Sequence, residues 1–346
     1  MPHLNNVSQF VPKSDSLIAI ACSHPANGQT FLFSARDYIS DDSFKIVRCH
    51  TCGLTVTTPQ PQDWSQYYPV AYYGGQGGNR FPKPVELLQN ALYSSRARKV
   101  EEINEGCKGR VLDIGCGRGL LLKQFKQRGW EVHGTELDDK SAKFAREVLG
   151  LPIKTGELLD MQFPDEHFDA VVMWHVLEHV PVVSTLMSEI SRILKPGGIF
   201  LVGVPNFGSI EARFAKAGWF HLDVPRHLNH FTKTTLRQNL SSAGFATKDF
   251  SHFAPEYDSF SFVQSTLNRL GLRHNLLYNF LRGQKAKVLG GKNSSPFQLI
   301  LTLILAAPLG VLSFFFTTLA GLMQQGATIT IFARKESAKS KSVERV

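Results

Sequence analysis

The chain has 346 residues, of which 43% are hydrophobic and 19% are charged. This composition excludes a wholly disordered chain, a collagen-like repeat and a small disulfide scaffold, and the length suits about two domains of ~100–200 residues each. Five cysteines are too few for a disulfide framework, so we expect a reducing compartment. No basic head with a following apolar run begins the sequence, which predicts that no signal peptide is present.

The formal net charge of +9 is concentrated at one end of the sequence. Residues 1–268 hold 27 basic and 27 acidic side chains, whereas residues 269–346 hold 11 basic and 2 acidic ones. Because this excess accompanies the most hydrophobic part of the chain, it favours an anionic membrane surface as the partner. The sequence shows no helix-turn-helix, aromatic RNA-binding motif or tandem zinc finger, so we expect no nucleic acid partner.

Shifts in composition divide the chain into five blocks. We expect a β-rich N-terminal cap over residues 1–75, an α/β domain over 76–256, an apolar insertion over 257–325, a last strand over 326–335 and a disordered tail over 336–346.

The N-terminal block contains a pair of closely spaced cysteines. Cys49 and Cys52 are followed by Gly53, a spacing that resembles half of a zinc knuckle. A tetrahedral zinc site needs two further ligands, for which Cys22 and His24 are the candidates, although a second C-x-x-C pair is the usual partner. Structural zinc and a plain β-hairpin cap with ordinary thiols are both open interpretations.

The central block alternates strand-like and helix-like segments, which is typical of an α/β domain with a parallel sheet. The expected strands are 110–114, 131–136, 152–155, 168–174, 199–204 and 326–334, and the expected helices are 84–105, 120–128, 139–149 and 182–194.

A glycine-rich turn follows the first of these strands and reads Asp113-Ile-Gly115-Cys-Gly117-Arg-Gly119. Glycines let the chain turn sharply here and let a ligand approach the backbone. Nicotinamide-binding proteins also place a glycine-rich turn at this point, but here an acid precedes the first glycine. A carboxylate suits a ligand that bears an ammonium group and would repel a diphosphate.

Two further acids follow the next two strands. Glu136 has two oxygens that can accept both hydroxyls of a ribose, and Glu157 can accept a hydrogen bond from an adenine amine. Each acid taken alone is most simply a solvated loop residue. Three acids at the carboxyl ends of three successive strands, where open α/β sheets bind ligands, predict one shared site.

These segments resemble those of the class I S-adenosylmethionine-dependent methyltransferases. The matching pieces are VLDIGCGRG, GTELD, TGELLDMQFPDEHFDAVVMWHVLEHV and LKPGGIFLVGVPN, and PRHLNHFTKTTLRQNLSSAGF is similar to the ubiquinone-type and sugar-modifying subgroup. The resemblance implies a Rossmann-like, seven-stranded, mostly parallel sheet with helices on both faces, and S-adenosyl-L-methionine as the cofactor.

The resemblance also implies which residues bind the cofactor. They are Asp113, Gly115, Cys116, Gly117, Gly119, Glu136, Leu137, Glu157, Leu158 and His175. It implies that the glycines contact the methionine end, that Glu136 contacts the ribose, and that Glu157 and Leu158 lie near the adenine. Related sugar-modifying methyltransferases carry a zinc knuckle ahead of the catalytic domain, which favours the zinc interpretation of the paired cysteines.

The run His175-Val-Leu-Glu178-His179 matches an inverted zinc-protease motif. A protease needs this motif on a continuous helix, whereas here it follows a strand and is closed by Pro181, so we disfavour that class. In a methyltransferase, Glu178 and His179 would either support the site or bind a divalent cation. The simpler alternative for His179 is a helix-start residue that packs under the sheet.

Methyl transfer to a hydroxyl is accelerated by a general base, for which histidine is suited near neutral pH. Among the candidates His175, His221, His227 and His230, we favour His227, because acceptor-binding loops in this fold usually follow the fifth strand. His227, His175, Glu178 and His179 are therefore the expected catalytic residues. For each histidine the alternative is an ordinary loop residue with a backbone partner.

The apolar insertion contains 41 residues between Lys292 and Arg334 without a charge or a histidine. It is long enough to span a bilayer, which takes ~20 residues per helix. Because basic residues flank it on both sides and Pro308-Leu-Gly310 interrupts it, we expect a helical hairpin that dips into an anionic inner leaflet through residues 282–324. The alternative is a buried helical pair or a dimer interface.

The sequence therefore predicts a cytoplasmic methyltransferase at the inner face of a membrane. It would methylate oxygen, rather than carbon, on a small or lipid-linked acceptor derived from a sugar or a quinone. A non-catalytic binding module with the same fold and a nicotinamide-dependent oxidoreductase are the alternatives, and the oligomeric state is not predicted.

Overall fold

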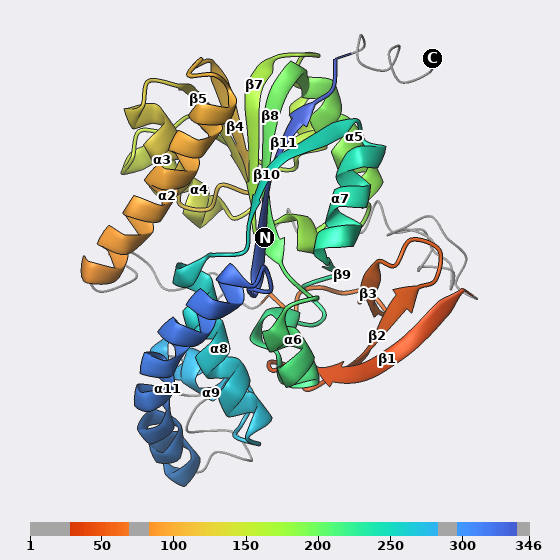
Figure 1. Ribbon diagram of the computed structural model, residues 1–346, viewed down its shortest axis with the longest axis vertical. Helices are drawn as coiled ribbons and strands as arrows, with labels where there is room; N and C mark the ends of the chain where they lie inside the picture. Colours follow the sequence, from red (N-terminus) through yellow and green to blue (C-terminus); the bar gives the residue numbers. More distant parts are fainter. Residues whose placement is uncertain (1–27, 69–82, 283–295, 338–346) are drawn as a thin grey trace. The chain divides into compact units, whose positions relative to one another are not determined.

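The computed structural model describes residues 28–68, 83–282 and 296–337. The chain forms two compact units, each built from several segments (Figure 1). Unit 1 comprises residues 1–77, 205–232 and 252–328, and unit 2 comprises residues 78–204, 233–251 and 329–346. Residues 205–232 therefore group with the N-terminal segment rather than with the α/β domain, and most of the expected tail lies outside the described residues.

Unit 2 contains a seven-stranded sheet in the order β10-β11-β8-β7-β4-β5-β6. Its strands are β4 (Arg110–Ile114), β5 (Glu131–Glu136), β6 (Ile153–Thr155), β7 (Phe168–Trp174), β8 (Leu194–Pro205), β10 (Phe245–Ser251) and β11 (Thr328–Lys335). The pairs that β4 forms with β5 and β7, β5 with β6, and β7 with β8 are parallel, whereas β10 pairs antiparallel with β11. This arrangement confirms the predicted Rossmann-like fold class.

Helices cover both faces of this sheet. Figure 1 shows α2 (Lys83–Ile103), α3 (Leu120–Gln127) and α4 (Asp139–Glu147) on one face, and α5 (Val183–Ile193) and α7 (Lys233–Ser242) on the other. Helix α3 illustrates how the sequence directs this packing, because Leu121, Leu122 and Phe125 recur at helical spacing and are all buried in the core. The core on this face therefore lies between the helices α2, α3 and α4 and the sheet strands, among them β4, which ends at the glycine-rich turn.

Unit 1 contains a four-stranded antiparallel sheet in the order β1-β2-β3-β9. Its strands are β1 (Gln29–Arg36), β2 (Ser43–Cys49), β3 (Thr55–Thr58) and β9 (Asn229–His230). The first three strands are the β-rich cap that the sequence predicts. The fourth comes from the segment after β8, which explains why residues 205–232 belong to this unit.

Unit 1 also contains the helices α6 (Ile210–Ala215), α8 (Pro255–Arg269), α9 (Leu276–Leu281) and α11 (Pro296–Leu322). Helix α11 continues through Pro308, so the expected hairpin is wrong. A proline removes one backbone donor, and the leucines and alanines around it favour helix on both sides. Among the described helices α11, with 27 residues, is the one long and apolar enough to cross a membrane, and an 18-residue window of it has a mean hydropathy of 2.5.

Candidate cofactor site and its histidines

The glycine-rich turn after β4 has the backbone conformation that its sequence predicts. Gly115, Gly117 and Gly119 have φ values of +66°, +54° and +73°, a region that side-chain-bearing residues rarely adopt. Gly115 is also closely packed, because a Cβ added there would lie 2.5 Å from Cγ2 of Val176. Both the turn and the approach of the segment after β7 therefore require glycine at this position.

Hydrogen bonds join this turn to the end of β5. The N–H of Cys116 donates to the carbonyl of Thr135 over 3.0 Å, and the N–H of Gly117 donates to Oε2 of Glu136 over 2.6 Å. The other carboxylate oxygen of Glu136 accepts from the N–H of Asp138 over 2.8 Å. The carboxylate is thus held at the mouth of the turn, and each of its oxygens has a further lone pair to offer a ligand.

The third acid is positioned by β6. The N–H of Gly156 donates to the carbonyl of Glu136 over 3.0 Å, which places Glu157 just beyond the same edge of the sheet. Leu158 is buried at the start of the 3-10 helix η3 (Leu158–Met161), whereas Leu137, which follows Glu136, is 61% exposed. Leu137, which follows Glu136 and precedes Asp138, therefore offers apolar surface to a ligand bound by the acids.

Burial raises the pKa values of the three acids of this site. Asp113 is 3% exposed, and burial raises its pKa well above the usual range, with a further rise from the charge of Glu136. Burial also raises the pKa of Glu136 and of Glu157. Because desolvation disfavours the carboxylates, a cationic ligand beside Asp113 would be strongly favoured. The same burial raises the pKa of the Cys116 thiol, which therefore stays protonated.

The turn after β7 brings His175 and Glu178 together. Nδ1 of His175 lies 3.2 Å from Oε1 of Glu178, whose side chain is 1% exposed, and the N–H of His175 donates to the carbonyl of Gly203 over 2.9 Å. His175 has a φ of +54°, an uncommon conformation that often marks functional turns. His179 ends the short 3-10 helix η4 (Leu177–His179), so the run does not lie on the continuous helix of a zinc protease.

Trp174, which ends β7, is a feature of this turn that the sequence did not reveal. The Arg96 guanidinium of α2 lies over its ring at 3.8 Å, and a Cβ at Gly203 of β8 would lie 2.6 Å from the ring. The indole is therefore confined between a cation and a glycine, directly before His175. No sequence signal links these residues, because they come from three separate elements.

His227, the favoured general base, belongs to unit 1. Its Nδ1 lies 2.7 Å from the carbonyl oxygen of His221, and since a carbonyl can only accept, Nδ1 carries the proton. In its neutral form the ring would then have its lone pair on Nε2, which is the form of histidine that accepts a proton. Of the other expected catalytic residues, His175, Glu178 and His179 lie on one turn of unit 2.

His230 has a different environment. Its Nε2 lies 2.8 Å from Oγ1 of Thr57, and that hydroxyl donates to the carbonyl of His227 over 2.7 Å. Burial lowers the pKa of His230 to about 3, so the ring is neutral. His230 therefore joins β9 to β3.

The paired cysteines lie on one tight turn between β2 and β3. Cys49 ends β2 and is buried, Cys52 is half-buried, and the N–H of Gly53 donates to the carbonyl of Cys49 over 3.0 Å. The other two expected zinc ligands, Cys22 and His24, lie outside the described residues. The structure therefore describes half of the expected donor set.

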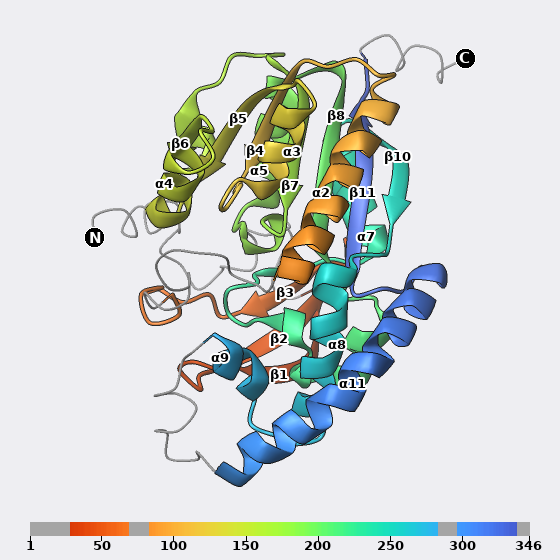
Figure 2. The ribbon, with the colours of Figure 1, turned by 90° about the vertical axis from the view of Figure 1, so that its left-hand side faces the viewer.

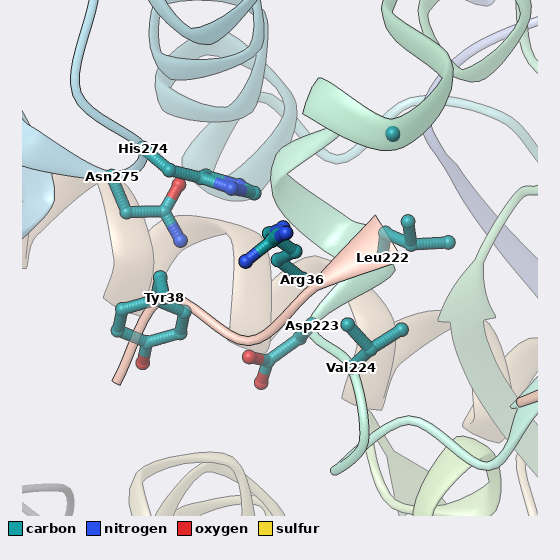
Figure 3. Close-up of a pocket in the computed structure, with 8 residues that line it drawn as sticks. Arg36, Tyr38, Leu222, Asp223, Val224, His274 and Asn275 are labelled. Carbon is teal, nitrogen blue, oxygen red and sulfur yellow. The ribbon is translucent and has the colours of Figure 1, made fainter. Parts of the chain in front are cut away.

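Unit 1 also contains a small cavity (Figure 3). Its volume of about 10 Å³ has room for about one water molecule. Figure 3 shows Tyr38, Asp223 and His274 around it, and the fully buried Arg226 nearby bonds to Asp37 over 2.6 Å and to Asp223 over 2.7 Å. This cavity is too small for a methyl acceptor.

Residues 85–248 match a family model described as a methyltransferase domain. A ubiquinone biosynthesis O-methyltransferase from Rhodopseudomonas palustris is 36% identical over an alignment of 183 residues, and the match covers 49% of this chain and 71% of that protein. Proteins of the same name from Paramagnetospirillum magneticum and Dechloromonas aromatica are 40% and 36% identical over 44% and 32% of this chain. The chain spans 65% and 50% of their respective lengths.

Among solved structures, a SAM-dependent methyltransferase from Archaeoglobus fulgidus is 20% identical, with a TM-score of 0.45. The match covers 71% of this chain and 94% of that one.

Proposed function

Because the chain belongs to the S-adenosylmethionine-dependent methyltransferases, we propose that it transfers a methyl group from S-adenosylmethionine to an oxygen of a small or lipid-linked acceptor. The observation that carries this proposal is the group of Asp113, Glu136 and Glu157 at the ends of three neighbouring strands, with the glycine turn between the first two. The names of the relatives support oxygen as the methylated atom, and a sugar- or quinone-derived acceptor is the class that we favour.

The donor set fits this cofactor. Buried Asp113, whose pKa is raised, would receive the methionine ammonium, and the lone pairs of Glu136 would accept the ribose hydroxyls. Leu137 and Leu158 would flank the adenine, with Glu157 near its amine. When bound, S-adenosylmethionine supplies an electrophilic methyl group on a sulfonium.

The remaining chemistry falls to the acceptor and the protein. The acceptor oxygen forms a bond to the methyl carbon as the sulfur–carbon bond breaks, and the hydroxyl proton passes to a base. We propose His227 as this base because its Nδ1 donates to the carbonyl of His221, so that the neutral ring would have its lone pair on Nε2. A general base contributes about 10²–10⁴-fold, and orientation of the reactants contributes about 7–11 kcal/mol in favourable cases.

His175 and Glu178 would support the site rather than take the proton. Nδ1 of His175 pairs with buried Glu178, and its backbone is tied to Gly203, so the ring has a fixed orientation beside the turn. His179 follows on the same turn and would share this supporting role.

Calorimetry and a labelled methyl donor test the proposal. We expect S-adenosylhomocysteine to bind and NAD not to bind, and Asp113→Ala to weaken binding. Incubation with fractionated cell extract should then yield a labelled methyl ether. Binding without any labelled product would favour a non-catalytic binding module, and binding of NAD alone would favour an oxidoreductase.

We also propose that Cys49 and Cys52 provide two thiolates of a structural zinc site, with Cys22 and His24 as the other ligands. The support is the position of both cysteines on one tight turn. The purified chain should contain about one zinc, and Cys49→Ser should lower this content. Exposed Cys107 offers the matched control, because Cys107→Ser should leave the zinc content unchanged.

A further inference from the structure

Helix α11 exposes large apolar side chains, and its fully buried side chains are small or carry a hydroxyl group. The residues of α11 that are fully buried are small or hydroxyl-bearing, namely Thr302, Ser313, Thr317 and Ala320, each at most 3% exposed. Its opposite side, here called the outer face, consists of large apolar residues with exposed fractions of 63%, 65%, 66% and 79% at Ile304, Val311, Phe315 and Leu322. A surface helix in water shows the reverse pattern.

The inner side of α11 already has its protein partners. Helix α8 lies beside it (Figure 2), and the rings of Phe262 and Phe316 stack with their centroids 4.2 Å apart. Leu305 and Leu309 join a small core with residues of α8 and α9. Packing within unit 1 therefore accounts for the inner side and leaves the outer face exposed.

Small and hydroxyl-bearing residues between helices, with large apolar residues outside, are typical of proteins in contact with lipid. The flanking charges match an anionic lipid surface. No acidic residue occurs between Asp258 and Glu336, whereas eight basic residues do, among them exposed Arg269 at the end of α8. We propose that the outer face of α11 docks into the interfacial layer of an anionic bilayer, with the helix parallel to the membrane plane.

Two observations favour this parallel orientation over a membrane crossing. Helix α8 accompanies α11 and buries Asp258 and Gln264, with exposed fractions of 1% and 0%, so a crossing would carry those polar groups into hydrocarbon. The 27 residues of α11 also extend about 40 Å, which exceeds the ~30 Å hydrocarbon core. Docking at the cytoplasmic face would bring the enzyme to a lipid-linked acceptor. The docking proposal itself does not require that the proposed methyl transfer is correct.

Flotation of the full-length protein with vesicles tests the docking. We expect binding to phosphatidylglycerol-containing vesicles that weakens in high salt and with phosphatidylcholine alone. The triple variant Ile304→Ser, Val311→Ser and Phe315→Ser should bind at least 10-fold more weakly. The matched control is Leu87→Ser with Val148→Ser in unit 2, which are 70% and 63% exposed, and this control should bind as the unmodified protein does.

The binding of S-adenosylhomocysteine and the far-UV circular dichroism of each variant establish that it is folded. The proposal is overturned if the unmodified protein does not float, or if the folded triple variant floats equally well. Light scattering that shows a dimer, which the triple variant dissociates, would also overturn it, because the outer face would then cover a second copy.

Tryptophans introduced singly at Ile304, Val311 and Leu322 test the orientation. After subtraction of the native tryptophan signal, lipids brominated near the headgroup should quench all three to a similar extent. Deep quenching at Val311 with shallow quenching at the other two positions would show a crossing helix and overturn the parallel orientation.

Discussion

The Glu136 carboxylate accepts a hydrogen bond from the backbone N–H of Gly117 over 2.6 Å, which joins the end of β5 to the glycine turn after β4. One acidic side chain therefore shapes the turn and also presents its other lone pairs to a ligand. Charge-assisted hydrogen bonds of this kind are short and stronger than neutral ones. The shape of the cofactor site thus depends on the ionised form of Glu136.

We expect Glu136→Gln to lower the affinity for S-adenosylhomocysteine roughly 10- to 100-fold, because a hydrogen bond to a charged group contributes about 1.5–3 kcal/mol. Titration calorimetry measures this loss. Glu131→Gln, at the other end of β5, is the matched control, because its side chain is 60% exposed and far along the strand from the turn. An equal loss in both variants would contradict a specific role for Glu136.

Asp113 should make cofactor binding pH-dependent. Burial holds its pKa well above the usual range, so below that pKa the free protein carries a proton that an incoming ammonium would displace. Affinity for S-adenosylhomocysteine should therefore rise with pH until Asp113 is fully ionised. Calorimetry in two buffers of different ionisation enthalpy should detect the released proton. In Asp113→Asn this release should disappear, and its persistence would point to another group.

Gly203→Ala should destabilise unit 2 by about 1–3 kcal/mol, because the added Cβ would lie 2.6 Å from the ring of Trp174. The displaced ring would also lose its contact with Arg96. Gly310→Ala in α11 provides a comparison, because nothing lies within 4 Å of an added Cβ there. Denaturant unfolding should show a loss for the first variant and no loss for the second.

Glu211 should make stability fall with rising pH. It is 2% exposed in α6, and its Oε1 accepts from the hydroxyls of Ser261 and Ser265 over 2.5 and 2.8 Å. Burial raises its pKa to about 7, above the unfolded value of 4.5. Its contribution is therefore fully present below pH 4.5 and is lost as the pH rises through 7, a change of roughly 3 kcal/mol.

The difference in unfolding free energy between the unmodified protein and Glu211→Gln isolates this effect from other titrating groups. The variant should gain relative stability between pH 5 and pH 8. Glu147→Gln is the control, since that carboxylate is 63% exposed in α4. A difference that does not change with pH would show that Glu211 ionises normally.

The sequence predicts the sheet of unit 2 well, because its information is local. The buried run 110–114 lies between Gly109 and Gly115, and the buried run 168–174 is apolar along most of its length. Asp113, Glu136 and Glu157, near the ends of β4, β5 and β6, mark the ligand edge. The confinement of Trp174 between Arg96 and Gly203 could not be predicted, since it joins elements that are distant in the chain.

The apolar insertion shows a second limit of sequence interpretation. Pro308 suggested a hairpin, but a proline costs one hydrogen bond and the helix α11 continues. The outer face of α11 could not be predicted either, because a segment that is apolar on all sides has no hydrophobic periodicity that distinguishes its two faces. The burial of Ser313 and Thr317 in the structure reveals which side faces the protein.

The position of β11 between β8 and β10 has a consequence for biosynthesis. Helix α11 precedes β11 in the chain, so it leaves the ribosome while the sheet still has a gap. In a nascent chain that stops before Thr328, β10 lacks its hydrogen-bonded neighbour. The long apolar helix α11 is then exposed before the sheet is complete, a state in which chains are prone to aggregate. Release of β11 is thus the step that completes the sheet of unit 2.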